Sequence, residues 1–108
     1  MPQTQQSLSP AAQRLVRLMQ WVHFGRIEGL AVSGGEPVFD PAPRVIRHIK
    51  FGRQNGPRPE LEIADFELKR EVLDLFEQLS SIRAGVIRSL TVQHGLPVAM
   101  EIEEVAAA

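Results

Sequence analysis

Two stretches of the chain follow one pattern: GRIEGLAVSGGEPV occupies residues 25–38 and GVIRSLTVQHGLPV occupies residues 85–98. In the first, Leu30 and Val32 flank a smaller residue, which puts both on one face of a strand, and the second stretch repeats this alternation. Gly34-Gly35 and His94-Gly95 follow at the point where a tight hairpin needs positive φ angles. Pro37 and Pro97 then require an edge or a non-bonded position. Each stretch therefore predicts a β-hairpin.

A helix is expected before each hairpin. Ser9 and Pro10 supply an N-cap and a first-turn proline, and apolar residues at helical spacing then predict a helix over about 10–23 that Gly25 ends. Before the second hairpin, Asp65 is the expected N-cap of a helix over about 66–83, with Gly85 as its stop.

The similarity between the halves extends beyond the hairpins. With an offset of 60 residues, residues 13–38 align with residues 73–98, and the shared positions are glycines, a proline and apolar residues that determine backbone geometry. Such self-similarity indicates an internal α-β-β duplication. It predicts an α+β, two-layer sandwich in which two helices cover one face of an antiparallel sheet of four to six strands.

The length of 108 residues suits a single domain with one core. We divide it into a flexible tail at 1–8, a first α-β-β repeat at 9–40, a strand-bearing basic linker at 41–64, a second repeat at 65–104 and a tail at 105–108. In the linker, the alternating run Arg44–Phe51 predicts an additional strand, with Leu61-Glu62-Ile63 as its expected partner. A one-turn helix also fits the spacing of Val45, Ile46 and Ile49.

Charge is distributed unevenly along the chain. The net charge is −1, yet residues 1–59 carry eight Lys and Arg against three Asp and Glu, and residues 60–108 carry four against ten. Opposite charges on two halves favour their packing together, self-association or a charged partner such as an acidic protein. The chain has no cysteine, which excludes disulfides and thiolate metal sites. It has no apolar run long enough to span a membrane and no signal-like start, and a cytoplasmic location is the default expectation.

The basic linker is the first candidate site. Cations on a strand and its following loop can contact the phosphates of a nucleic acid or another anion, and the candidates are Arg44, Arg47, Lys50, Arg53 and Arg58. The alternative is an edge strand whose charges prevent aggregation.

A second candidate site is apolar. Leu18, Trp21 and Phe24 lie to the side of the stripe that faces the sheet, and large aromatic residues anchor protein interfaces. We expect this strip to hold a homodimer together. The alternative reading makes Trp21 a residue at the edge of the core.

The sequence offers little for catalysis. His23, His48 and His94 lack metal-ligand spacing, and Gly34-Gly35 lacks the lysine and the following helix of a phosphate-binding loop. We therefore expect no enzyme activity, no catalytic or metal-binding residues and no cofactor.

The runs Ile82-Arg83-Ala84-Gly85 and Val92-Gln93-His94-Gly95 resemble small uncharacterised bacterial domains made of a helix and a β-hairpin. Phe24-Gly25 matches the aromatic–glycine junction of those domains better than Ala84-Gly85 does. The resemblance covers about half of the chain and implies a fold fragment and a bacterial origin, without an activity.

Together these observations predict a non-enzymatic interaction module that self-associates, with a nucleic-acid-binding accessory protein as the alternative. A small-molecule site between the two repeats is a third possibility.

Overall fold

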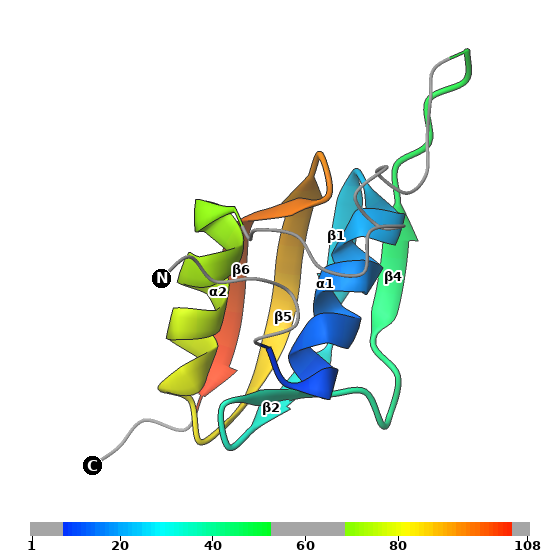
Figure 1. Cartoon of the computed structure of the whole chain (residues 1–108). Helices are drawn as coiled ribbons and strands as arrows, with labels where there is room; N and C mark the ends of the chain where they lie inside the picture. Colours follow the sequence, from blue (N-terminus) through cyan, green and yellow to red (C-terminus); the bar gives the residue numbers. More distant parts are fainter. Residues whose placement is uncertain (1–7, 53–68, 105–108) are drawn as a thin grey trace.

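The chain forms a six-stranded antiparallel sheet with two helices on one of its faces, as a computed structural model shows for residues 8–52 and 69–104 (Figure 1). This architecture confirms the predicted α+β fold. Along the chain the elements are α1 (Pro10–Val22), β1 (Gly25–Glu28), β2 (Leu30–Ser33), β3 (Glu36–Val38), β4 (Arg44–Arg47), α2 (Arg70–Ser80), β5 (Ala84–Gln93) and β6 (Leu96–Glu104).

Strand β5 lies at the centre of the sheet. It pairs along one edge with β6 and along the other with β1 and β2, which are consecutive segments interrupted at Gly29. Gly29 has φ +74°, and its N–H donates to the carbonyl of Ile87 at 2.9 Å, so the break stays attached to β5. Strands β4 and β3 pair with β1 and β2 respectively and form the opposite edge of the sheet from β6.

Both predicted hairpin turns are confirmed. Gly34 and Gly35 have φ +60° and +79°, and His94 and Gly95 have φ +56° and +74°. Two successive positive φ angles define the type I′ turn, whose twist suits a two-residue hairpin. The prolines at 37 and 97 lie in β3 and β6, the edge strands that the missing N–H requires.

One apolar core joins both helices to the sheet. The strand residues that face the helices are buried, and Leu15, Met19 and Leu79 pack on them from α1 and α2 with no exposed surface. The strand residues of this core are Ile27, Leu30, Val32, Ile87, Leu90 and Val92. The alternation of apolar residues in the sequence therefore identified the face of the sheet that the helices cover.

Helix α1 begins as predicted and ends differently. The Ser9 hydroxyl accepts a hydrogen bond from the Ala12 N–H at 3.1 Å, which caps the helix. The helix ends at Val22, and His23 follows as its C-cap with φ +64°. The expectation that Gly25 ends the helix is therefore wrong. Gly25 instead lets β1 approach β4 closely, because a Cβ at this position would lie 2.0 Å from the carbonyl oxygen of Ile46 in β4.

Helix α2 is shorter than the predicted range of 66–83. It begins at Arg70 after the extended residue Lys69 and ends at Ser80, and Gly85 lies in β5. The hydroxyls of Ser80 and Ser81 donate hydrogen bonds to carbonyls of the last turn. Such side-chain bonds compete with the backbone hydrogen bonds of the helix, so serine is favoured where a helix ends. The predicted cap, Asp65, lies outside the described residues.

The strand predicted over residues 44–51 is shorter in the structure, because β4 ends at Arg47 and residues 48–52 lie outside it. Residues 44–47 are extended, so the one-turn helix is excluded there. Strand β4 pairs antiparallel with β1, from Glu28 opposite Arg44 to Gly25 opposite Arg47. The expected partner at 61–63 lies outside the described residues. Strand β4 thus continues the edge that β3 begins, beside α1 (Figure 1).

Candidate functional site

An apolar groove of about 520 Å³ lies between α1 and the chain from β3 to β4. Leu18 and Trp21 line it from the helix, and Phe39 and Val45 line it from the sheet side. Trp21 keeps 42% of its surface exposed although it is the largest apolar side chain of the helix. This α1 groove therefore presents an aromatic residue to solvent at the edge of the core.

Two arginines stack on the aromatic rings of the α1 groove. The guanidinium carbon of Arg14 lies 4.4 Å from the centre of the Phe39 ring, and that of Arg47 lies 4.4 Å from the centre of the Trp21 ring. A cation over an aromatic face is attracted to it and restricts its motion. Together with Arg17, which also lines the groove, these residues make its surroundings basic.

A second groove, of about 350 Å³, lies between α2 and β6. Its apolar lining includes Leu75, Leu90 and Met100, and Glu71 and Asp74 stand on its helical side. Asp74 forms an ion pair with Arg70 at 3.3 Å, in which both side chains remain more than half exposed. This α2 groove is apolar with an acidic side.

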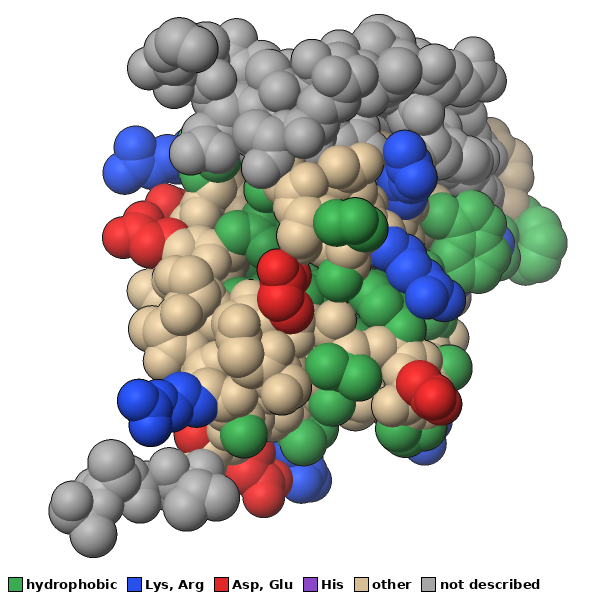
Figure 2. Space-filling model, turned by 60° about the horizontal axis from the view of Figure 1, so that its bottom comes forward, with side chains coloured by type: hydrophobic (Ala, Val, Ile, Leu, Met, Phe, Trp, Pro, Cys, Tyr) green, Lys and Arg blue, Asp and Glu red, His purple; other side chains and the backbone are tan. Residues whose placement is uncertain are grey.

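Each groove lies beside one of the two helices. With the offset of 60 residues, three lining positions coincide: Arg14 with Asp74, Leu18 with Gln78, and Phe39 with Ala99. The charge changes sign and an aromatic ring is replaced by a methyl group. Figure 2 shows hydrophobic side chains at the surface with Lys, Arg, Asp and Glu side chains among them.

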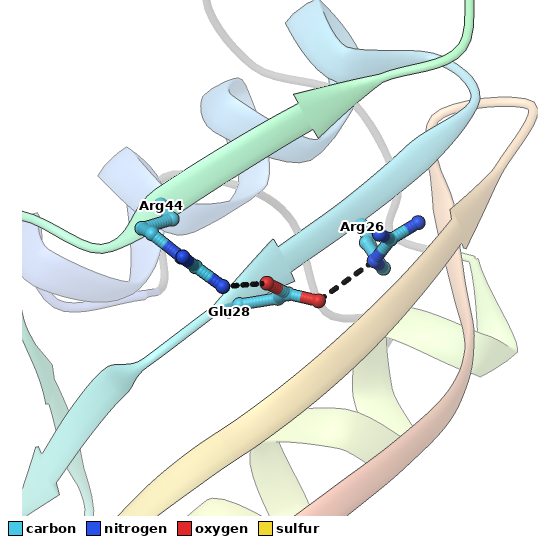
Figure 3. Close-up of polar contacts among 3 residues, drawn as sticks. All are labelled: Arg26, Glu28 and Arg44. Atoms are coloured by element: carbon cyan, nitrogen blue, oxygen red, sulfur yellow. Dashed lines mark hydrogen bonds and ion pairs between the residues drawn. The ribbon is translucent and has the colours of Figure 1, made fainter.

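The sheet face that no helix of the described residues covers, termed the open face, carries an ionic cluster centred on Glu28 (Figure 3). Arg26 donates from Nε to Glu28 Oε2 at 2.7 Å, and Arg44 donates from Nη2 to Glu28 Oε1 at 2.6 Å. The hydrogen bond from Arg26 has the largest effect and that from Arg44 the next, and together they hold the pKa of Glu28 below its ordinary value. The same face holds a polar hollow around Gly29, also lined by Arg88 and Glu101.

The structure separates the basic candidate residues. Arg44 lies on the open face, paired with Glu28, whereas Arg47 lies on the helical side over Trp21. Lys50 is exposed beyond the end of β4, and Arg53 and Arg58 lie outside the described residues. The basic residues of β4 therefore serve two opposite surfaces of the sheet.

The apolar candidate residues are partly brought together. Leu18 and Trp21 share the α1 groove. Phe24 lies elsewhere, with its ring 4.7 Å from the rings of both His23 and His94. The Gly95 N–H donates to the His23 carbonyl at 2.9 Å, so this aromatic cluster ties the end of α1 to the second hairpin turn.

Sequence reasoning did not single out Arg14, Phe39, Glu71 or Asp74 as interface residues. Glu71 and Asp74 are exposed, as charged residues on the outer face of a helix usually are. The signal that could have found them is the 60-residue offset, because it aligns a cation of α1 with an anion of α2.

Comparisons with known proteins returned no matching family model, no matching curated protein and no matching solved structure. In the described parts of the chain, no helix is long and apolar enough to cross a membrane. Residues 8–52 and 69–104 also contain no group of three or more acidic or histidine side chains placed to hold a metal ion.

Proposed function

We propose that this chain is a non-enzymatic interaction module that associates with a second copy of itself through its helical face. The observation that carries the proposal is the exposed indole of Trp21 beside Leu18 in the α1 groove. A few residues carry most of the binding energy at protein interfaces, and tryptophan is enriched among them. We place this function in the cytoplasm, the compartment expected from the sequence.

The stacking of Arg47 on Trp21 supports the proposal further. The Arg47 Nε is buried without a hydrogen-bond partner among the described residues, and the side chain holds the indole in place from β4. An anchor that is already ordered loses less conformational entropy when a partner covers it. The α1 groove is thus preorganised for a contact.

The nucleic-acid alternative receives less support from the described residues. A phosphate backbone needs cations that follow one surface, whereas Arg44 and Arg47 lie on opposite faces of β4. Arg44 is also engaged by Glu28. We therefore do not advance a second function.

Sedimentation equilibrium over a wide range of protein concentration tests the proposal. We expect a monomer–dimer equilibrium that Trp21→Ala weakens by about 30-fold, which corresponds to about 2 kcal/mol for an interface anchor. Val86→Ala is the matched control, because Val86 is 40% exposed but lies by the polar hollow of the open face.

Circular dichroism should show that both variants keep their fold. A wild-type chain that stays monomeric at every concentration contradicts the proposal. So does a dimer that Trp21→Ala leaves unchanged.

A further inference from the structure

We infer that the self-association proposed above is two-fold, with the basic α1 groove of each copy set against the acidic α2 groove of the other. The inference rests on the proposed function and specifies its interface. The observation behind it is a pair of apolar grooves, one beside each helix on the same face of the sheet, whose rims carry opposite charges.

Charge complementarity selects the occupant of each groove. Arg14 and Arg17 are exposed on the α1 side, and Glu71 and Asp74 are exposed on the α2 side. Two α1 grooves placed together would oppose arginine with arginine, and two α2 grooves would oppose carboxylate with carboxylate. Like charges across an interface suppress such pairings, so the contact between unlike grooves is the favoured one.

The shapes of the grooves differ in the same complementary sense. The α1 groove contains the rings of Trp21 and Phe39, and Trp21 is exposed at its edge. At the position equivalent to Phe39, the α2 groove has only the methyl group of Ala99, above an apolar lining that includes Leu75 and Leu90. An exposed indole from one copy can therefore enter the hollow of the other.

Symmetry then limits the assembly to a dimer. Both helices cover the same face of the sheet, so both grooves are available on one side of each copy (Figure 1). A two-fold axis in the plane of the interface, running between the helices, brings the two unlike contacts together simultaneously. Such an interface is closed, whereas a single head-to-tail contact would continue into longer chains.

Charge reversal of one groove at a time tests this arrangement in the full chain. The first variant is Arg14→Glu/Arg17→Glu, and the second is Glu71→Arg/Asp74→Arg. In a homodimer of either variant, both contacts become repulsive. We expect the dissociation constant of the dimer to rise about 30-fold, because two charges are reversed at each of the two contacts. The control Arg83→Glu/Arg88→Glu changes the net charge as much as the first variant but lies outside both grooves.

Mixing the two variants gives the decisive result. One carries two acidic grooves and the other two basic grooves, so an equimolar mixture should form a heterodimer about as stable as the wild-type dimer. Combining all four substitutions in one chain should likewise restore its homodimer. Circular dichroism checks that each variant is folded, and the lost Arg70–Asp74 pair is too exposed to matter much.

The possible failures are distinguishable. If the wild type dimerises and neither variant differs from the control, or the mixture does not recover, the paired-groove interface is wrong and the proposed self-association stands. If the wild type does not self-associate, both are wrong.

Discussion

Replacement of Gly25 by alanine tests how the sheet positions the α1 groove. Gly25 has φ +150°, and a Cβ there would lie 2.0 Å from the Ile46 carbonyl oxygen, about 1 Å inside the closest approach that real Cβ atoms make. The unfavourable backbone conformation costs about 1–3 kcal/mol and the overlap about 1–3 kcal/mol more. We therefore expect Gly25→Ala to lower the free energy of unfolding by about 4 kcal/mol, a large part of the stability of a small domain.

Gly29→Ala is the matched control. Gly29 also has a positive φ, +74°, but an added Cβ there would have no neighbour within 4 Å. Only the left-handed backbone is penalised, at about 1–2 kcal/mol. In urea unfolding followed by circular dichroism, with a slope of about 1.5 kcal/mol per M, the midpoint should fall by about 2.5 M for Gly25→Ala and by about 1 M for the control.

A second readout connects this change to the site. Gly25 pairs with Arg47, which lies over the Trp21 ring, so displacing β4 should alter the fluorescence of Trp21, the only tryptophan of the chain. Gly29→Ala should leave that emission unchanged. Equal destabilisation by the two substitutions, or a Gly25→Ala variant with wild-type stability and emission, would refute the close approach of β1 to β4.

Three further substitutions test the core, the helix cap and the ionic cluster. Leu79→Ala should cost about 2–5 kcal/mol in urea unfolding because Leu79 is fully buried, whereas Val98→Ala, at 50% exposure, should cost less than about 0.5 kcal/mol. Ser9→Ala should cost about 1 kcal/mol in thermal unfolding, since it removes the α1 cap and the 2.7 Å hydrogen bond that the hydroxyl donates to Glu36. The pKa of Glu28 is lower in the folded chain than in the unfolded one, so its stabilising effect is present above the unfolded-state pKa and is lost as pH falls through the folded-state pKa. Glu28→Gln should therefore flatten the acid side of a stability–pH profile and leave its alkaline side unchanged.

Local signals in the sequence predicted much of the fold. The turns at Gly34-Gly35 and His94-Gly95 follow from residue types that accept positive φ, and the buried strand faces follow from simple alternation. The pairing of β4 with β1 was not predicted, because it depends on Gly25 approaching a strand about twenty residues away. The early end of α2 was also missed, since apolar spacing continues to Ile82 although the helix ends at Ser80.

The candidate site was predicted only in part, because local spacing shows which residues share a helix face but not which elements meet in space. Leu18 and Trp21 could be identified because their helical spacing places them beside the buried stripe. The run of cations from Arg44 onward suggested one basic surface. Side chains of a strand alternate between its two faces, so Arg44 and Arg47, three residues apart, lie on opposite faces of the sheet. The acidic groove depends on residues of α2 and β6 meeting in space, which spacing alone does not show.

Acrylamide quenching of Trp21 as a function of protein concentration tests the self-association through the helical face most directly. The chain has a single tryptophan, and acrylamide is uncharged, so the signal reports the accessibility of that indole without interference from the groove charges. The account predicts that quenching decreases as concentration rises, with the same midpoint as dimer formation in sedimentation. Dimer formation without any loss of Trp21 accessibility, or constant quenching in a chain that remains monomeric, would contradict it.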